Sequence, residues 1–341
     1  MPLSAMPAET KPRRFVFLLC PDFSLIAFTA AIEPLRLANH LSLRRLYTWE
    51  LASETGEPVA CSNGTVVQVD RGLGEVPRDT TVLVCAGLSV SRAESKPVIT
   101  WLRKLSRTGV TLGGICTGAH VLARAGLLDG KRATIHWENQ SSFAEDFPEV
   151  ELSNLIFCVE KGVVTCAGGT AAADMMLYLI GQDQGPDLAS LIAEMLIHTQ
   201  IRSATDEQRL SIPARIGVRH PKLVQVIQAM ERSIEDPVSP ADLARAVNMS
   251  TRQLERLFRR YLNRSPKRYY MELRLEKARS LLLQTDMSVI NVALACGFTS
   301  PSHFSKCYRA HFGRTPYRER GNPGGERGAA SKGHGLAPEE P

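Results

Sequence analysis

The sequence lacks any long apolar segment. Residues 15–20 form an apolar run behind two arginines, like the core of an export signal. This run is shorter than the roughly 7–15 apolar residues that such a signal needs, and Pro21 ends it. No later run approaches the roughly 18 apolar residues of a membrane span. These absences argue against the usual patterns of exported and membrane-spanning proteins, so we expect a soluble, cytoplasmic protein with no membrane partner.

Closely spaced cysteine pairs are also absent. The eight cysteines are scattered without a C-x-x-C pair, as Cys20, Cys61, Cys85, Cys116, Cys158, Cys166, Cys296 and Cys307. Most of them stand in apolar contexts, which predicts buried, reduced thiols. Neither a zinc site nor a disulfide framework is indicated, and we expect no metal and no other cofactor.

Positive charge is concentrated in one part of the chain. The whole sequence has 41 Lys and Arg against 35 Asp and Glu, a formal net charge of +6. Residues 221–320 contain 18 Lys and Arg against 9 Asp and Glu, and the rest of the chain contains 23 against 26. This concentration predicts that residues 221–320 bind nucleic acid. The length of 341 residues leaves room for two or three domains.

Residues 221–320 contain two similar segments, and each is typical of a helix-turn-helix, at about 239–260 and 288–310. In both, an apolar pair precedes the turn, and three apolar residues follow it at helical spacing. The matching residues are Leu243, Ala244, Leu254, Leu257 and Phe258 in the first segment and Val292, Ala293, Phe304, Cys307 and Tyr308 in the second. Their offset is 49 before the turn and 50 after it, which predicts one extra residue in the second turn.

The second helix of each segment presents polar donors on its outer face. If the apolar residues point inward, a rotation of about 100° per residue turns these donors outward. The predicted DNA-binding residues are Arg252, Arg256, Arg259, Ser302, Lys306 and Arg309. Such side chains contact guanine edges in a major groove or the phosphates beside it.

A connecting helix is predicted from Ser265-Pro266 to about Gln284, because serine is a good N-cap and proline a good first helical residue. At about 1.5 Å per residue this helix spans about 27 Å. That length is near the roughly 34 Å between successive major-groove segments, so one chain can read two adjacent grooves.

The carboxy-terminal region resembles the DNA-binding domain of the AraC/XylS family of bacterial transcription regulators. The resemblance is carried by LARAVNMSTRQLERLF, SPKRYY and VALACGFTSPSHFSKCYRAHFGRTPYRER, and it covers residues 221–320. It implies sequence-specific binding of double-stranded DNA, contact with RNA polymerase and activation of transcription. A plain helical bundle with a solvated basic face is the alternative, but it does not explain the duplication.

Residues 13–203 alternate between strand-like and helical patterns. Strands are expected at 15–19, 47–52, 81–85, 110–115, 133–136, 155–159 and 163–167, and helices at 25–39, 98–106, 117–125, 170–180 and 187–202. The pattern predicts a doubly wound, flavodoxin-like α/β domain, followed by an all-α domain with the two helix-turn-helix units. Residues 204–220 are predicted to be a linker, and residues 1–12 and 321–341 to be disordered.

The stretch Gly113-Gly114-Ile115-Cys116-Thr117-Gly118-Ala119-His120 is the most informative part of the first domain. A strand, a glycine-flanked turn with Cys116 at its apex and a following helix form a nucleophile elbow. The helix N-terminus is expected to favour a thiolate. His136 ends a later strand and can approach the same pocket, whereas His120 is expected to be a core histidine. Gly168-Gly169-Thr170 is interpreted as an ordinary helix start rather than as a carboxylate-binding turn.

Residues 13–200 are similar to the class I glutamine amidotransferase-like superfamily, in its PfpI-type intracellular-peptidase branch. In that superfamily the elbow cysteine is the nucleophile and a histidine activates it. Peptidase members have a histidine directly after the cysteine, where this chain has Thr117. Members also place an acid from the first helix beside the cysteine, where this chain has apolar residues and the nearest acid is Glu33. We therefore expect no enzyme, and a cysteine-dependent amidase or peptidase-like enzyme fused to a DNA-binding domain is the alternative.

Together, the two halves resemble the GlxA-type subgroup of regulators, in which the first domain is a sensor that has lost the chemistry and kept the pocket. The stretches Asp22-Phe23-Ser24, 33–39 and 135–138 resemble members that respond to cationic amines such as betaine, carnitine or arginine. A tryptophan face and a carboxylate can hold such a cation. The candidate pocket residues are Glu33, Cys116, His136, Trp137 and Glu138. The alternative for Trp137 is a core tryptophan beside a solvated carboxylate.

The resulting hypothesis is a transcription regulator controlled by a small-molecule effector. Effector binding would shift the population of arrangements of a homodimer held by the sensor domain, or of the two domains. A constitutive architectural DNA-binding protein is a further alternative, but it would not require a large pocket-forming domain.

Overall fold

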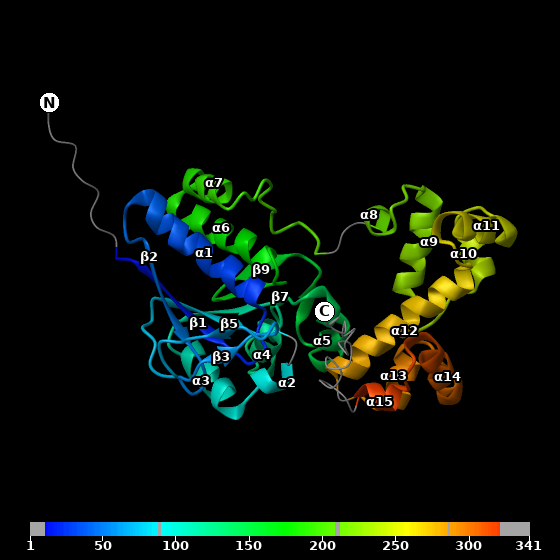
Figure 1. The fold of residues 1–341 in the computed structure, drawn as a ribbon, viewed down its shortest axis with the longest axis horizontal. Helices are drawn as coiled ribbons and strands as arrows, with labels where there is room; N and C mark the ends of the chain where they lie inside the picture. The colour runs from blue at the N-terminus through cyan, green and yellow to red at the C-terminus, as the bar shows by residue number, and fades with distance from the viewer. Residues whose placement is uncertain (1–10, 88–89, 209–211, 286, 321–341) are drawn as a thin grey trace, which may run out of the picture. The chain divides into compact units, whose positions relative to one another are not determined.

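The computed structural model describes residues 11–87, 90–208, 212–285 and 287–320. The chain divides into two compact units, Met1–Arg209 and Leu210–Pro341, and Figure 1 labels most of their elements. Apart from residues 11 and 12, the segments for which we predicted disorder, 1–12 and 321–341, lie outside the described residues.

A six-stranded sheet forms the centre of the first unit, in the order β2-β1-β5-β6-β10-β9. Its strands are β1 (Arg13–Leu19), β2 (Tyr47–Ala52), β5 (Thr80–Cys85), β6 (Thr111–Ile115), β9 (Phe157–Glu160) and β10 (Val163–Cys166). Neighbouring strands are parallel except for β9 and β10, which are antiparallel. The prediction of a doubly wound, mostly parallel sheet is confirmed.

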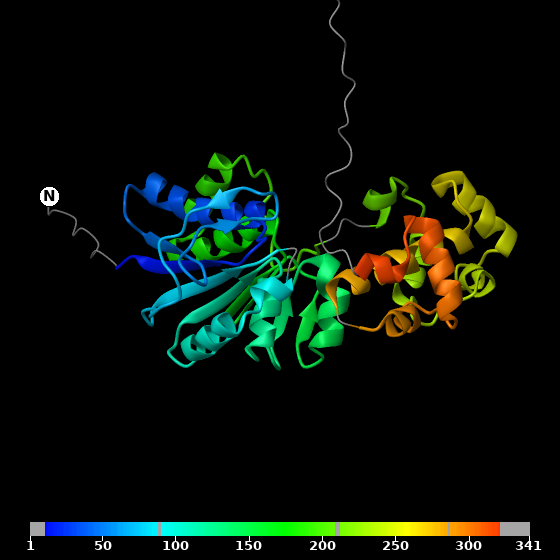
Figure 2. The same cartoon turned by 60° about the horizontal axis from the view of Figure 1, so that its bottom comes forward.

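Helices cover both faces of this sheet (Figure 2). On one face lie α1 (Leu25–Ser42), α6 (Ala171–Gln184) and α7 (Pro186–Met195), packed with Phe15 and Phe17 of β1. On the other face lie α2 (Val90–Ala93), α3 (Lys96–Ser106) and α4 (Gly118–Arg124), packed with Val16 and Leu18. Because successive strand residues point to opposite faces, the uninterrupted apolar run of β1 supplies both cores.

One predicted strand lies outside the main sheet. We expected residues 133–136 to form a strand of the main sheet. Instead, β7 (Arg132–Thr134) pairs in parallel with β8 (Glu151–Ser153) as a separate two-stranded sheet. The N–H of Thr134 in β7 donates to the side-chain Oγ1 of Thr165 in β10 at 3.0 Å, and not to a backbone carbonyl of the main sheet. The 3-10 helix η1 (Trp137–Asn139) and α5 (Gln140–Asp146) connect β7 to β8, and β3 (Val59–Ala60) and β4 (Val66–Val67) form a small antiparallel pair.

The last helix of the first unit is shorter than the sequence indicated. We predicted a helix over 187–202, but α7 ends at Met195. Ile197 adopts the left-handed region with φ 55°, and the backbone N–H of His198 donates to the Ala193 carbonyl at 2.9 Å. This bond pattern closes a helix in the manner of a Schellman motif. Residues 198–208, here called the exit segment, therefore follow α7 as non-helical chain.

The second unit is all-α in its described residues, as predicted. Its helices are α8 (Ile212–Ile216), α9 (Pro221–Arg232), α10 (Pro240–Ala246), α11 (Thr251–Leu262), α12 (Pro266–Gln284), α13 (Val289–Ala295), α14 (Pro301–Phe312) and α15 (Pro316–Arg320). Tyr270 of α12 lies in the core formed with α9, α10 and α11, whereas Leu275 and Leu281 lie in the core formed with α13 and α14. The helix α12 therefore links two small cores, and its bounds match the predicted connecting helix.

The segment that we predicted as a linker, 204–220, is divided between the units. The Asp206 carbonyl accepts from Ile156 N–H at 2.9 Å, and Gln208 N–H donates to the Asn154 carbonyl at 3.1 Å, both within the first unit. Ile212 of α8 is buried in the second unit. Among the helices of the described residues, none is long and apolar enough to cross a membrane.

Candidate DNA-binding and effector sites

The first helix-turn-helix consists of α10, a turn at residues 247–250 and α11. Ser239 caps α10, and Ser250 caps α11 in a capping box. In the turn, Asn248 has φ 52°, and Met249 N–H donates to the Ala244 carbonyl at 2.9 Å. Short polar residues thus provide both helix starts and the left-handed turn position, which fixes how α11 leaves α10.

The second helix-turn-helix repeats this geometry with one insertion. Gly297, with φ 72°, takes the place of Asn248, and Phe298 N–H donates to the Ala293 carbonyl at 2.9 Å. The turn between α13 and α14 runs over residues 296–300, and the added residue is Thr299. The extra residue predicted from the offset is confirmed.

The two recognition helices, α11 and α14, bury almost all of their predicted inward residues. Buried are Leu254, Leu257, Phe258, Phe304 and Tyr308. Cys307 is the exception, because it is only half-buried and its Sγ lies 3.4 Å from His303 Nε2. Its position on α14 faces an open groove that Met271 and Leu275 of α12 also line.

The outer faces of α11 and α14 carry the predicted DNA contacts. All six side chains are exposed: Arg252, Arg256, Arg259, Ser302, Lys306 and Arg309. Among the described residues, none of these five cations forms an ion pair, whereas the nearby Arg264 and Arg268 both pair with Glu272. The exposed cations therefore keep their donors available for an external acceptor.

In the first unit, the elbow lies at the carboxyl end of β6. Cys116 has φ 60°, an uncommon value for a residue with a side chain, and its N–H donates to the Cys166 carbonyl of β10 at 3.0 Å. Thr117 Oγ1 donates to the Gly87 carbonyl at 2.7 Å, which ties the elbow to the chain after β5. The carboxyl ends of β5, β6 and β10 therefore meet around Cys116.

The Cys116 side chain is buried, with 9% of its surface exposed. Burial raises the pKa of its thiol to about 11, against a lowering hydrogen bond from the Thr117 backbone, and the nearby Glu138 carboxylate adds to the rise. The thiolate expected from the helix N-terminus is therefore wrong. Burial is the largest of these effects, and the hydrogen bond from the Thr117 backbone offsets only part of it.

We expect Cys116 to resist alkylation near neutral pH. Because its pKa is raised to about 11, the thiolate fraction should rise about tenfold per pH unit up to that value. Labelling by iodoacetamide, followed by peptide mass spectrometry, should show a rate at Cys116 that still climbs between about pH 8 and pH 10. The half-buried Cys307 provides an internal comparison of accessibility. A rate at Cys116 that levels off below about pH 8 would contradict the raised pKa.

The rim beside the elbow is formed by the start of η1. His136 Nδ1 lies 4.0 Å from Glu138 Oε2, and the rings of His136 and Trp137 lie 5.5 Å apart. Burial lowers the pKa of His136 while Glu138 opposes that effect, so the imidazole is neutral at pH 7. Trp137 is 43% exposed and is therefore not a core tryptophan. Of these three residues, Glu138 lies near enough to Cys116 to raise the pKa of its thiol.

Glu33 does not join this group. It forms an exposed ion pair with Arg36 at 2.6 Å on α1. Since α1 begins at Leu25, Glu33 lies about 12 Å along the helix from its start, at about 1.5 Å per residue. Its carboxylate is already occupied by a partner on the same helix.

Comparison with known proteins agrees with this division of sites. The model of the DJ-1/PfpI family matches residues 13–182, and a helix-turn-helix domain model matches residues 243–322. The HTH-type transcriptional regulator GbdR of Pseudomonas aeruginosa is 45% identical over 321 residues, which are 94% of this chain and 88% of that protein. The chain belongs to the AraC-type transcriptional regulators with a DJ-1/PfpI domain.

Two further relatives of this regulator align along most of its length. The HTH-type transcriptional regulator CdhR of Pseudomonas aeruginosa is 48% identical over 90% of this chain and 91% of its own. The HTH-type transcriptional regulator GlxA of Rhizobium meliloti is 39% identical over 89% of this chain and 94% of its own. The whole two-unit architecture, and not one domain alone, is therefore shared with DNA-binding regulators.

His120 of this regulator is a core residue. It is 5% exposed, its Nδ1 pairs with Glu94, and its Nε2 lies 3.5 Å from Asp146 Oδ2. The rings of Phe143 and Phe147 pack edge-on against it. Both imidazole nitrogens face carboxylates, as expected for a satisfied core histidine rather than a base acting on Cys116.

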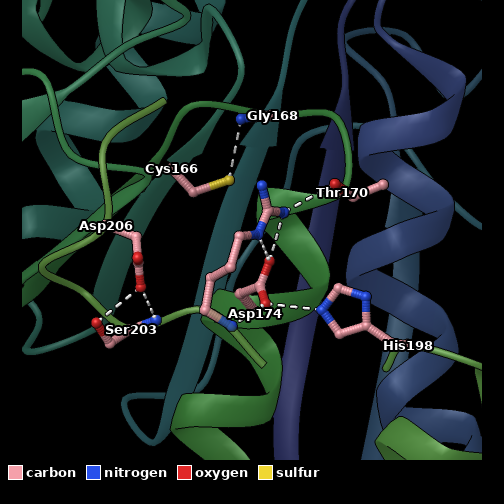
Figure 3. Close-up of polar contacts among 8 residues, drawn as sticks. Cys166, Gly168, Thr170, Asp174, His198, Ser203 and Asp206 are labelled. Carbon is pink, nitrogen blue, oxygen red and sulfur yellow. Dashed lines mark hydrogen bonds and ion pairs between the residues drawn. The ribbon is translucent and has the colours of Figure 1, made fainter. Parts of the chain in front are cut away.

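A buried carboxylate holds the exit segment against α6. Asp174 is fully buried and accepts from Arg202 N at 2.8 Å, from Nε at 3.0 Å and from Nη2 at 2.6 Å, while His198 Nε2 lies 2.8 Å away (Figure 3). Arg202 Nη2 also donates to Thr170 Oγ1 at 2.8 Å. The turn before α6 reaches the elbow, because a Cβ on Gly168 would lie 2.6 Å from that of Cys116. We call Asp174, His198, Arg202 and Thr170 the Asp174 cluster.

A second contact ties the exit segment to the rim. Gln208 Nε2 donates to Thr134 Oγ1 at 2.8 Å, to the Ile135 carbonyl at 2.9 Å and to the Leu155 carbonyl at 3.1 Å. Ile135 directly precedes His136. The exit segment therefore contacts both sides of the elbow neighbourhood before the chain continues to α8. Sequence reasoning missed these residues, although an aspartate inside the apolar run AAADMMLYLI of α6 was an available signal.

Proposed function

We propose that this regulator activates transcription by reading two adjacent major-groove segments of one operator. The observation that supports the proposal is the pair of recognition helices in one compact unit, each with an exposed outer face of donors. Arg252, Arg256 and Arg259 read the segment under α11, and Ser302, Lys306 and Arg309 contact the segment under α14. We infer contact with RNA polymerase, action in the cytoplasm and a homodimer held through the first unit.

We also propose that a small cationic amine binds at the rim of the elbow, with betaine, carnitine and arginine as the candidate class. The exposed indole of Trp137 offers a π face, and Glu138 supplies a carboxylate beside it. A neutral His136 adds no competing positive charge. Glu33 is left out of this site because it lies about 12 Å along α1 from the start of that helix, at about 1.5 Å per residue.

We propose that the first unit binds an effector and that Cys116 does not catalyse a reaction. In the described part of the chain no histidine nitrogen lies within hydrogen-bonding distance of Cys116 Sγ, and the raised pKa of the thiol disfavours the nucleophilic thiolate. The nucleophile-elbow geometry of Cys116 is the observation that favours the alternative, a cysteine-dependent amidase or peptidase. The alkylation profile separates the two, because such an enzyme requires a thiolate that forms near neutral pH.

The exit segment is the proposed path from effector to DNA. It contacts Thr170 beside the Gly168 turn through Arg202, and the strand before His136 through Gln208. A ligand that favours one arrangement of the rim would favour one arrangement of the exit segment, and so change the population of DNA-binding states. The effector can shift this population only to the extent that its affinity differs between the states.

Isothermal calorimetry of the full chain with betaine, carnitine and arginine tests the effector site. We expect one of these compounds to bind, and Trp137→Ala to weaken it about 2- to 30-fold, which corresponds to a cation–π contribution of about 0.5–2 kcal/mol. Glu138→Gln should also weaken binding, because it removes the ion pair. The matched control is Glu33→Gln, which should leave the affinity unchanged.

Two results would count against this assignment. Absence of heat with all three amines would remove the proposed ligand class. Unchanged affinity in Trp137→Ala, with a loss in Glu33→Gln, would move the site from the rim of the elbow to α1.

A further inference from the structure

The helix α12 holds the loop that enters the first helix-turn-helix. This interhelix loop, residues 233–238, runs between α9 and α10. The hydroxyl of Tyr270 donates to the Ser233 carbonyl at 2.5 Å and accepts from Val238 N–H at 3.4 Å. Tyr270 is 5% exposed. The two ends of the loop are therefore fixed to one buried side chain of α12.

One turn further along α12, Arg274 holds the turn of the second helix-turn-helix. Its Nε donates to the Cys296 carbonyl at 2.8 Å, and its Nη2 donates to the Gly297 carbonyl at 2.6 Å. The guanidinium also lies over the Phe298 ring, 4.2 Å from the centroid. Residues four apart on a helix share a face, so Tyr270 and Arg274 act on neighbouring parts of the structure.

The loop and the turn touch each other at Gly297. A Cβ there would lie 2.6 Å from the Ile234 carbonyl oxygen and 2.7 Å from that of Glu235. Both neighbours are backbone atoms, which cannot give way as a flexible side chain can, and the φ of 72° adds strain for any other residue. Glycine thus permits direct backbone contact between the interhelix loop and the turn of the second helix-turn-helix.

This arrangement is not repeated in the first turn. There the carbonyl of Asn248, which corresponds to Gly297, accepts from Lys222 Nζ of α9 at 3.2 Å. The contacts of Tyr270 and Arg274 on α12 therefore do more than close a helix-turn-helix, because the first helix-turn-helix closes its turn without them. What is particular to Tyr270, Arg274 and Gly297 is that they join the loop before the first helix-turn-helix to the turn of the second.

We propose that Tyr270, Arg274 and Gly297 form a spacing lock, which fixes the recognition helices α11 and α14 relative to each other and thereby sets the separation of the two DNA segments that the regulator accepts. The inference rests on the proposed function, because it assumes that both helices read DNA at once. The three are positioning residues, since they act through the recognition helices rather than on bases. Loss of the lock should make the protein tolerant of altered spacing.

The test measures affinity against spacing for the full-length protein. Duplexes selected from a random pool by the wild-type protein are rebuilt with one or two base pairs inserted or deleted between the protected segments, and binding is followed by fluorescence anisotropy. A shift of one base pair removes base contacts under one helix, so we expect a wild-type loss of about tenfold or more. In Tyr270→Phe, Arg274→Lys and Gly297→Ala we expect the same shift to cost less than about threefold.

Arg268→Ala provides the matched control, because Arg268 is an exposed arginine of the same helix whose ion pair within the described residues is with Glu272. It should keep the wild-type dependence on spacing whatever its overall affinity. Far-UV circular dichroism verifies that each variant is folded, and if Gly297→Ala does not fold, Arg274→Lys and Tyr270→Phe still decide the outcome. Folded lock variants that retain a tenfold penalty would overturn the spacing lock alone. A wild-type protein that selects only one segment would instead overturn the proposed function.

Discussion

Replacing Arg256 with alanine should cost about 1–3 kcal/mol of operator binding and relax the preference at one base position. Arg256 is the middle one of the three exposed arginines on the outer face of α11. Leu254 and Leu257 of the same helix are buried on its inner face. A bidentate guanidinium contact to a guanine edge supplies this discrimination, and alanine removes it. Binding to a set of single-base variants of the selected operator measures the effect. An equal loss on every sequence, selected or random, would contradict base contact by Arg256.

Arg309→Ala is the informative partner of this variant. Arg309 lies toward the end of α14, where we assign it to a phosphate rather than to a base. Its removal should weaken binding about equally on all sequences and lower the slope of log affinity against log salt by about 1. A changed base preference in Arg309→Ala would reverse the two assignments.

Of the substitutions proposed for this protein, removing the carboxylate of the Asp174 cluster should cause the largest decrease in the free energy of unfolding. Asp174→Ala leaves Arg202 and His198 without their buried acceptor, and we expect the first unit to lose about 2–4 kcal/mol. The loss stays below that for a wholly buried pair, because the side chains of Arg202 and His198 are 31% and 21% exposed.

Urea unfolding followed by tryptophan fluorescence measures this loss in the first unit. The three tryptophans, Trp49, Trp101 and Trp137, all lie in that unit, so the signal does not report the DNA-binding unit. Asp187→Ala, an exposed acid on α7, is the control and should change stability by no more than about 0.5 kcal/mol. A midpoint for Asp174→Ala equal to that of the control would show that the cluster contributes nothing.

In the second unit, the two helix-turn-helix motifs and the helix α12 between them could be predicted from the sequence, whereas α8, α9 and α15 were not predicted. Serines and prolines mark the helix starts, apolar residues follow at helical spacing, and both signals are local. The duplication even located the extra residue, which the structure places at Thr299. Local signals do not predict the contacts that join the two helix-turn-helix motifs to each other. Gly297 was visible as a turn glycine, but its contact with the Ile234 and Glu235 carbonyls depends on how the two cores pack.

The first unit was predictable in its class and less so in its details. Short apolar runs predicted the parallel sheet, but the pairing of β7 with β8 depends on a contact between two segments that η1 and α5 separate in the chain. The Asp174 cluster joins residues 28 positions apart, and no periodicity signals such a contact. At the elbow, the geometry followed from the motif, whereas the state of the thiol did not. Burial of Cys116 depends on the packing of β5, β6 and β10, which the motif does not specify.

Hydroxyl-radical footprinting of the full-length protein on a selected operator tests most directly whether the two recognition helices read adjacent segments. We expect each bound chain to protect two stretches on one face of the duplex, about one helical turn or 10–10.5 base pairs apart. Lys306→Ala should weaken protection of the stretch under α14 and leave the other in place. A single protected stretch for each bound chain, or no protection at low ionic strength, would contradict reading by two helices.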